Sequence, residues 1–170
     1  MLNIVYISIS GNTRSFVHKI KVQAKQQHTS DTQAPLVSLK RITNQTDLIR
    51  FKQPFFCFVP TYVEGGNSMM DVKMQAEKPK EIETLTMDDE LNYADNYKNC
   101  LGLIGSGNRN FNYLFAYTAK LYSSKYHIPV IDTYELRGMP SEAKRIYSEM
   151  IKSERHSQIS HRRFGKYYQI

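Results

Sequence analysis

Residues Leu2–Thr13 read L-N-I-V-Y-I-S-I-S-G-N-T, and this stretch indicates the class of fold. An apolar run ends in a hydroxyl-rich loop around Gly11, and residues 13–27 then repeat apolar side chains at helical spacing. The first turn of a helix offers N–H groups without intrahelical acceptors and a partial positive charge. Strand, glycine turn and helix start together predict a seat for a phosphate group.

The loop itself narrows the kind of phosphate. Gly11 permits a sharp turn, and Ser8, Ser10 and Thr13 add hydroxyl donors. The loop lacks the Gly-Lys-Ser/Thr ending of a triphosphate loop and the three-glycine spacing of a dinucleotide fingerprint. It suits one terminal phosphate, such as that of flavin mononucleotide (FMN). The alternative is an ordinary strand-to-helix turn capped by Ser or Asn.

Size and composition indicate one globular domain. The chain has 170 residues, of which 41% are hydrophobic and 23% charged. No apolar run approaches the length of a membrane span, and the first residues enter a strand pattern without a secretion signal. We therefore expect a cytoplasmic protein that does not bind a membrane.

The two cysteines indicate no metal site. Cys57 and Cys100 each lie inside an apolar run, and neither has a second Cys or a His at ligand spacing. We expect buried, reduced thiols with a structural role.

The charge is unevenly distributed along the chain. The formal net charge is +7, yet residues 77–95 hold seven acidic residues against Lys78 and Lys80. The rest of the chain is strongly cationic, which predicts an anionic partner: a phosphate cofactor, an acidic protein or nucleic acid.

The apolar pattern predicts five strands alternating with helices. Strand patterns occupy residues 2–9, 35–39, 54–59, 100–104 and 129–134, and helix patterns occupy 13–27, 112–125 and 141–153, with a helical turn at 47–50. The second helix is expected to bury Leu114, Tyr117 and Leu121, and Ser141 to cap the third. This order predicts a doubly wound α/β fold, a five-stranded parallel sheet with helices on both faces.

The predicted domain covers residues 1–153, and residues 154–170 form a basic and aromatic tail. We expect the tail to extend the last helix or to be loosely ordered. The alternative is a docking or nucleic-acid-binding tail.

Three glycine-bearing loops follow predicted strands, after Ile7, Val59 and Ile104, so the fold brings them to one edge of the sheet. In the second loop, Tyr62 can stack on a planar ring. Gly65 and Gly66 can expose and flip backbone groups there.

The third loop predicts the opposite wall of the same site. Gly105 and Gly107 allow close backbone approach, and Asn108 and Asn110 can hydrogen-bond a pyrimidine edge. Phe111 can stack, although such an aromatic residue is as often part of a core.

Arg109 is expected to add positive charge near the ring. Cationic surroundings favour the anion of a reduced flavin, so we expect the fully reduced form to be reached readily and to react with dioxygen.

Four motifs, in this order, resemble the NrdI family, the flavodoxin-like accessory proteins of class Ib ribonucleotide reductase. The motifs are Ser8-x-Ser10-Gly11-Asn12-Thr13-Arg14, Pro60-Thr61-Tyr62 with Gly65-Gly66, Gly105-Ser106-Gly107-Asn108-Arg109-Asn110-Phe111 and Glu135-Leu136-x-Gly138-Met139-Pro140. The resemblance covers residues 1 to about 150. The chain departs from the family pattern at Asn112, where many members have Gly, and at Ala116, where many have Cys.

The resemblance implies a flavodoxin-like FMN protein whose reduced flavin converts dioxygen into superoxide. That oxidant serves the dimanganese site of the small subunit of class Ib ribonucleotide reductase, where a tyrosyl radical forms. An electron-donating reductase, such as a flavodoxin reductase, is implied as electron donor. The flavin carries the chemistry, so no side chain is a predicted catalytic acid or base. The implied FMN-binding residues are Ser8, Ser10, Gly11, Asn12, Thr13, Thr61, Tyr62, Gly65, Gly66, Gly107, Asn108, Asn110 and Phe111.

Two other functions stay open from the sequence. One is a flavodoxin-type one-electron carrier, for which an acidic surface would be usual. The other is an NrdI-like paralogue that acts as a binding module with a different partner.

Overall fold

Five parallel strands form one sheet in a computed structural model that describes residues 1–62 and 84–165, with side chains through residue 159. The strands are β1 (Leu2–Ile7), β2 (Val37–Ile42), β3 (Phe55–Pro60), β4 (Cys100–Gly107) and β5 (Val130–Glu135). Their order, β2-β1-β3-β4-β5, reverses direction between β1 and β3. The doubly wound α/β prediction is therefore confirmed, and the reversal marks the place where such sheets bind ligands.

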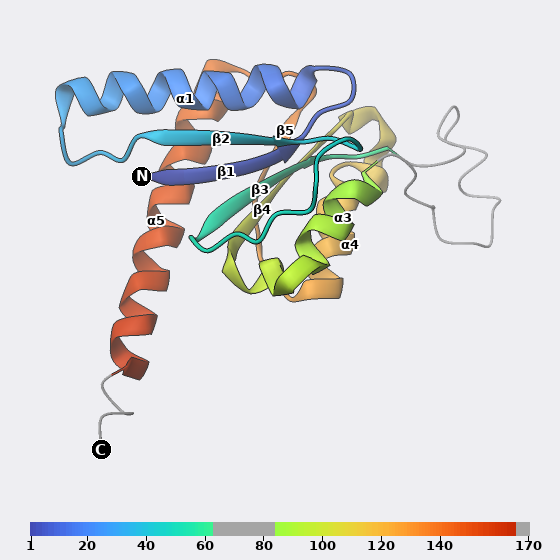
Figure 1. The fold of residues 1–170 in the computed structure, drawn as a ribbon. Coiled ribbons are helices and arrows are strands. Elements are labelled where there is room, and N and C mark those ends of the chain that lie inside the picture. Colours follow the sequence, from blue (N-terminus) through green and yellow to red (C-terminus); the bar gives the residue numbers. More distant parts are fainter. Residues whose placement is uncertain (63–83, 166–170) are drawn as a thin grey trace.

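Helices cover both faces of the sheet (Figure 1). On one face lie α1 (Asn12–Ser30) and α5 (Pro140–Gly165), and on the other lie α3 (Leu85–Asn92) and α4 (Tyr117–Tyr126). Two 3₁₀ helices, η1 (Tyr93–Asn99) and η2 (Arg109–Leu114), flank β4.

Each face has its own apolar core. Phe16 and Ile20 of α1 pack with Ile146 and Met150 of α5, all four fully buried. The opposite core includes Met87 and Leu91 of α3 with Ala119 and Tyr122 of α4. Full burial of such large apolar side chains contributes about 1.5–3 kcal/mol each, so the sheet is held firmly between its helices.

The strand β3 is buried along its whole length, as expected of a central parallel strand. Cys57 on this strand and Cys100 at the start of β4 are free and buried, which confirms the expected reduced, buried thiols. Burial raises the pKa of the Cys100 thiol to about 12 and also raises that of Cys57. Both therefore remain protonated at neutral pH.

The helical turn predicted at residues 47–50 is wrong, because residues 43–54 contain no helix. Side chains of α3 and η1 form hydrogen bonds with the backbone of this segment instead. The N–H of Ile49 donates to Glu90 at 2.9 Å, and the N–H of Phe51 donates to the side-chain oxygen of Asn96 at 2.8 Å. These bonds hold the segment extended along η1 and α3.

The helix predicted at residues 112–125 is also partly wrong. Asn112 has φ 47° and Ala116 has φ 55°, so η2 ends and α4 begins only at Tyr117. The buried face of α4 consists of Thr118, Ala119, Tyr122 and Tyr126, whereas Leu121 is exposed. A residue in the left-handed conformation changes which face of the following helix is buried. The spacing of apolar residues in the sequence does not reveal such a conformation.

The last helix begins one residue before the predicted Ser141 and continues to Gly165. Pro140 occupies its first position, where the missing N–H is not needed. The carboxylate of Glu142 accepts the N–H of Met139 at 2.7 Å, so Glu142 and not Ser141 caps this end. Beyond residue 153 the helix runs away from the sheet (Figure 1).

Within the described part of the chain, no helix is long and apolar enough to cross a membrane. The same residues hold no group of three or more His, Cys, Asp or Glu side chains arranged to bind a metal ion.

Candidate functional site

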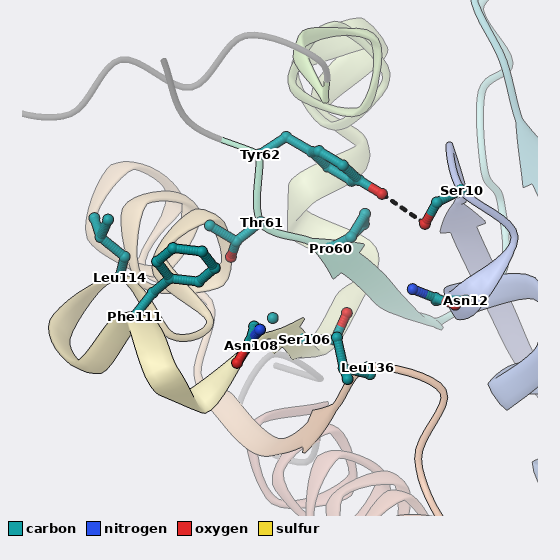
Figure 2. A pocket seen from close by; sticks show the side chains of 11 residues that line it. Ser10, Asn12, Pro60, Thr61, Tyr62, Ser106, Asn108, Phe111, Leu114 and Leu136 are labelled. Carbon is teal, nitrogen blue, oxygen red and sulfur yellow. Dashed lines mark hydrogen bonds between the residues drawn. The ribbon is translucent and has the colours of Figure 1, made fainter. Parts of the chain in front are cut away.

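A cavity of about 450 Å³ lies at the carboxyl ends of the strands, close to the reversal of strand order (Figure 2). Its volume is typical of a small-molecule site, which spans about 300–1,000 Å³. Loops after β1, β3, β4 and β5 contribute to it. The lining residues are Ser10, Asn12, Pro60, Thr61, Tyr62, Ser106, Gly107, Asn108, Phe111, Leu114 and Leu136.

The loop after β1 makes a sharp turn at Gly11 and leads directly into α1. Gly11 adopts φ 85°, a left-handed conformation that L side chains rarely take, and its carbonyl accepts the N–H of Ser15 at 3.0 Å. The buried hydroxyl of Ser8 accepts the N–H of Arg14 at 3.1 Å. Ser8 therefore fixes the loop from its buried side. Asn12 is the first residue of α1 and lines the cavity.

The loop after β3 closes the cavity from the other side. The hydroxyl of Tyr62 donates to the hydroxyl of Ser10 at 2.8 Å, which joins two strand ends (Figure 2). The N–H of Thr61 donates to the carbonyl of Ser106 at 3.0 Å, and the Thr61 hydroxyl accepts the N–H of Thr118 at 3.3 Å. Tyr62 is thus held at the cavity edge by bonded neighbours.

The end of β4 and η2 form the opposite wall. The side-chain oxygen of Asn108 accepts the N–H of Asn110 at 2.9 Å and caps η2. This cap leads into the turn of 3₁₀ helix that brings Phe111 and Leu114 to the cavity (Figure 2). The wall combines an amide group with apolar side chains, as a heteroaromatic ring requires.

Gly105 serves packing and not ligand approach, which corrects the prediction for this residue. A Cβ at this position would lie 2.7 Å from the Cβ of Ala116 and 2.8 Å from that of Ala119. Gly105 lies within β4, so its missing side chain lets α4 approach the sheet. Gly107, two residues on, does line the cavity.

Charged groups around the site are partly balanced. The Arg109 guanidinium lies 3.6 Å from the Glu135 carboxylate and covers the ring of Phe115, and Arg109 does not line the cavity. Its expected charge near a bound ring is therefore offset by Glu135. Two other guanidinium groups contact the first loop: Arg41 donates to the carbonyl of Ser8 at 2.9 Å, and Arg137 donates to the side-chain oxygen of Asn12 at 3.1 Å.

Tyr134 on β5 lies beneath the site. Its ring stacks on Phe16 with centroids 3.7 Å apart, and it is fully buried. Burial raises the pKa of Tyr134 to about 12. Tyr134 therefore stays neutral and packs the floor under the first loop.

The structure brings most of the predicted binding residues to this edge. Ser10, Asn12, Thr61, Tyr62, Gly107, Asn108 and Phe111 line the cavity. Ser8 and Thr13 are buried below the loop, Gly11 forms its turn, and Asn110 points its N–H at Asn108 outside the lining. Gly65 and Gly66 lie outside the described residues. Their roles toward a cofactor stay predictions.

Sequence reasoning did not select four lining residues: Pro60, Ser106, Leu114 and Leu136. Pro60 and Ser106 pair in the β3–β4 register at the strand ends, so a strand-end rule would have found them. Leu136 follows β5 directly, and its N–H donates to the carbonyl of Gly107 at 3.1 Å. Nothing in the apolar pattern distinguishes Leu114 from a core residue.

A parallel five-stranded sheet with this strand order, and a cavity at its carboxyl edge beside a glycine turn, define a flavodoxin-like protein. The sequence model of the family described as "NrdI Flavodoxin like" matches residues 4–148. The chain belongs to this family.

Relatives in streptococci agree with this assignment. An NrdI-like protein of Streptococcus pyogenes serotype M18 is 35% identical over 145 residues, covering 85% of this chain and 89% of the relative. A protein named NrdI from S. pyogenes serotype M4 is 29% identical over 157 residues, covering 92% of each chain. The chain is thus similar to proteins of both designations.

Solved structures share the fold at low sequence identity. A short-chain flavodoxin associated with a bacterial microcompartment has a TM-score of 0.57 at 16% identity, covering 90% of this chain and 99% of its own. Oxidised flavodoxin 2 of Bacillus cereus also has a TM-score of 0.57, at 15% identity, covering 89% of this chain and 99% of its own. These likenesses support the flavodoxin-like architecture.

Proposed function

We propose that the cavity binds FMN, with its phosphate at the start of α1. The observation that carries this proposal is the donor set of one cavity of about 450 Å³. A glycine turn and a helix start lie at one end, hydroxyls of Ser10 and Thr61 along one side, and apolar groups from Phe111 and Leu136 along the walls. A phosphate, a polyol chain and a planar ring need these groups in this order.

Individual residues would then have separate tasks. The first-turn N–H groups of α1 and the Ser10 hydroxyl hold the phosphate, and Thr61 and Ser106 face the polyol chain. Tyr62 and Phe111 flank the ring, and Asn108 hydrogen-bonds its polar edge. Gly65 and Gly66 lie outside the described residues, and their contact with the ring stays a prediction.

The chemistry supplied by FMN is reversible redox transfer, including electron transfer to dioxygen. Among the described residues, the side chains lining the cavity include no carboxylate, imidazole or amine, so these side chains bind and orient but exchange no proton at neutral pH. Support for dioxygen chemistry comes from the family and from the net charge of +7, which favours the anionic reduced cofactor.

We further propose that the oxidant produced is superoxide and that it serves the dimanganese site of a class Ib ribonucleotide reductase small subunit, where the tyrosyl radical forms. An electron-donating reductase, such as a flavodoxin reductase, would supply the electrons. Family membership and the NrdI names of relatives support this assignment.

The test begins with the full chain and added FMN. The complex is reduced completely without air, and the visible spectrum is followed as oxygen is admitted, with superoxide detected by cytochrome c reduction. Rapid return of the oxidised spectrum with superoxide release is the expected result. Activation of a manganese-loaded small subunit then tests the partner.

Two variants make the binding test specific. Ser10→Glu puts a negative charge at the start of α1, and Ser30→Glu puts the same charge at the exposed other end. We expect about tenfold or greater loss of FMN affinity only for Ser10→Glu, since like charges repel at short range.

Reduction that stops after one electron and persists in air would favour the electron carrier. Absence of FMN binding in the unmodified chain would contradict both functions and favour the binding module.

A further inference from the structure

The loop between β5 and α5 is fixed against α1. The ammonium group of Lys19 donates to the carbonyls of Arg137 and Gly138 at 3.0 and 2.6 Å. Gly138 adopts φ 59°, and a Cβ there would lie 2.3 Å from the ring of Phe16. Backbone contact this close requires glycine. The loop therefore packs against α1 in one position, and this position fixes the backbone of Arg137.

From that point Arg137 reaches the first turn of α1. Its Nε donates to the side-chain oxygen of Asn12 at 3.1 Å, across 125 residues of sequence. Asn12 lines the cavity and begins α1. The terminal nitrogens of Arg137 make no hydrogen bond within the described residues, and the side chain is exposed. A guanidinium group with two available terminal nitrogens therefore lies beside the predicted phosphate site.

The chemistry of this seat favours a cation. Among the described side chains that line the cavity at this end, Ser10 and Asn12 are neutral, and the backbone of the helix start adds a fractional positive charge. Arg14 in the first turn of α1 and Arg41, which donates to the Ser8 carbonyl, lie outside this lining. A phosphate monoester carries about −1.5 to −2 charges near pH 7. A guanidinium fork matches two phosphate oxygens in geometry as well as charge.

We propose that Arg137 binds the phosphate of FMN and makes this site select phosphorylated flavin over riboflavin. The inference rests on the proposed FMN function and deepens it by naming a specificity-determining residue. Asn12 then has a second task, since its side-chain oxygen orients the guanidinium group while its position opens the helix.

The test compares the affinities of FMN and riboflavin, which differ only in the phosphate. Titrations follow the quenching of flavin fluorescence by the full chain and by Arg137→Gln, Arg137→Lys and Lys52→Gln. Lys52 is exposed and precedes β3, at the opposite edge of the sheet, so Lys52→Gln removes the same charge far from the site.

We expect Arg137→Gln to weaken FMN about tenfold or more and to change riboflavin by less than about twofold, because it removes charge-assisted bonds to phosphate alone. Arg137→Lys should recover part of the loss as a single point charge. Lys52→Gln should leave both affinities unchanged.

A second measurement separates phosphate contact from simple bracing of Asn12. The ³¹P chemical shift of bound FMN is followed against pH. A neighbouring cation stabilises the dianion, so the second phosphate pKa should be lower in the unmodified chain than in Arg137→Gln. Equal phosphate pKa values, or equal FMN affinity in the two proteins, would overturn the role of Arg137 while leaving FMN binding intact. An unmodified chain that binds neither flavin would overturn both proposals.

Discussion

The hydroxyl of Tyr62 donates a hydrogen bond to the hydroxyl of Ser10 at 2.8 Å, although the two residues lie 52 positions apart. This bond joins the loop after β1 to the loop after β3, the strands between which the sheet reverses its order. It thereby links the predicted phosphate end of the cavity to the residue expected to cover the ring. We therefore expect binding at one end to be coupled to the position of the aromatic side chain at the other.

Replacing Tyr62 by Phe removes this bond and keeps the ring. We expect FMN affinity to fall about two- to tenfold, because one exposed hydrogen bond contributes about 0.5–1.5 kcal/mol. Tyr62→Ala should lose more, since the ring contact goes as well. Flavin fluorescence titration measures both losses. Identical affinities for Tyr62→Phe and Tyr62→Ala would show that the ring makes no contact with the flavin.

Gly105 allows β4 and α4 to approach each other, and Gly105→Ala is expected to reduce the free energy of unfolding by about 1–3 kcal/mol. The added Cβ would lie 2.7 Å from that of Ala116 and 2.8 Å from that of Ala119. Urea unfolding followed by circular dichroism gives the change.

The matched control is Ala116→Gly, which removes one of the two obstructing atoms. Ala116 has φ 55°, so glycine alone should be neutral or stabilising there. The double variant should recover part of the loss, giving a coupling energy in a double-mutant cycle. If the changes in unfolding free energy of the two single variants simply add up in the double variant, the Cβ atoms at positions 105 and 116 do not clash.

The fold was predictable because apolar runs and glycine turns alternate regularly. The buried strand β3 and the stripe Phe16, Val17, Ile20 and Ala24 on α1 follow directly from spacing. The segment around Ile49 and Phe51 could not be predicted this way. Its backbone hydrogen bonds go to Glu90 and Asn96, which are about forty residues away, and no local pattern contains them.

The site was predictable to the extent that it follows strand ends. Thr61 and Asn108 come directly after β3 and β4, Ser10 lies in the loop that follows β1, and parallel topology brings them together. Arg137 was missed because its contact with Asn12 depends on the seat of the loop after β5 against Phe16. The positive φ of Asn112 was not predicted either. Asn is one of the residues that adopt a positive φ most readily, and many family members have Gly at this position.

Asn96 is the main polar link between η1 and the segment after β2. Its amide nitrogen donates to the carbonyls of Ile49 and Glu90 at 2.7 and 2.8 Å, and its oxygen accepts the N–H of Phe51 at 2.8 Å. Asn96→Ala would remove the partner of these buried and partly buried backbone groups, so we expect a loss of about 2–4 kcal/mol in unfolding free energy.

Asn99→Ala is the matched control, since within the described part of the chain Asn99 donates one such bond, to the carbonyl of Phe51 at 2.8 Å. We expect it to cost about 1 kcal/mol in urea unfolding. Hydrogen exchange at Ile49 and Phe51 should accelerate in Asn96→Ala before global unfolding. Equal losses in the two variants would contradict the central role of Asn96.

The thiols of Cys57 and Cys100 should be inert in the folded protein. Burial raises the pKa of both thiols, that of Cys100 to about 12, so almost no thiolate forms at pH 8. Burial also keeps a thiol reagent from reaching either sulfur atom. We expect no reaction with Ellman's reagent in native buffer and two thiols in denaturant. Fast reaction at native conditions would contradict the buried positions.

Glu90 should give the folded protein a measurable pH dependence. The residue is buried, one carboxylate oxygen accepts the N–H of Ile49 at 2.9 Å, and the other makes no hydrogen bond within the described residues. Burial raises the pKa of Glu90 above its ordinary value of 4.5, although the Ile49 N–H and the charge of Lys40 oppose the rise. The folded state then binds more protons than the unfolded state just above pH 4.5, so this group lowers stability as pH rises.

Glu90→Gln keeps an acceptor for Ile49 and removes that ionisation. The variant should therefore gain stability relative to the unmodified chain as pH increases from about 4.5, until Glu90 is ionised in both states, and the gain should then stay constant. Urea unfolding at closely spaced pH values measures the difference. Asp89→Asn removes an exposed carboxylate from the same turn of α3 and should retain the original pH profile. A gain that shrinks with rising pH would mean that Lys40 and the Ile49 N–H outweigh burial, and that Glu90 stabilises the fold as a carboxylate.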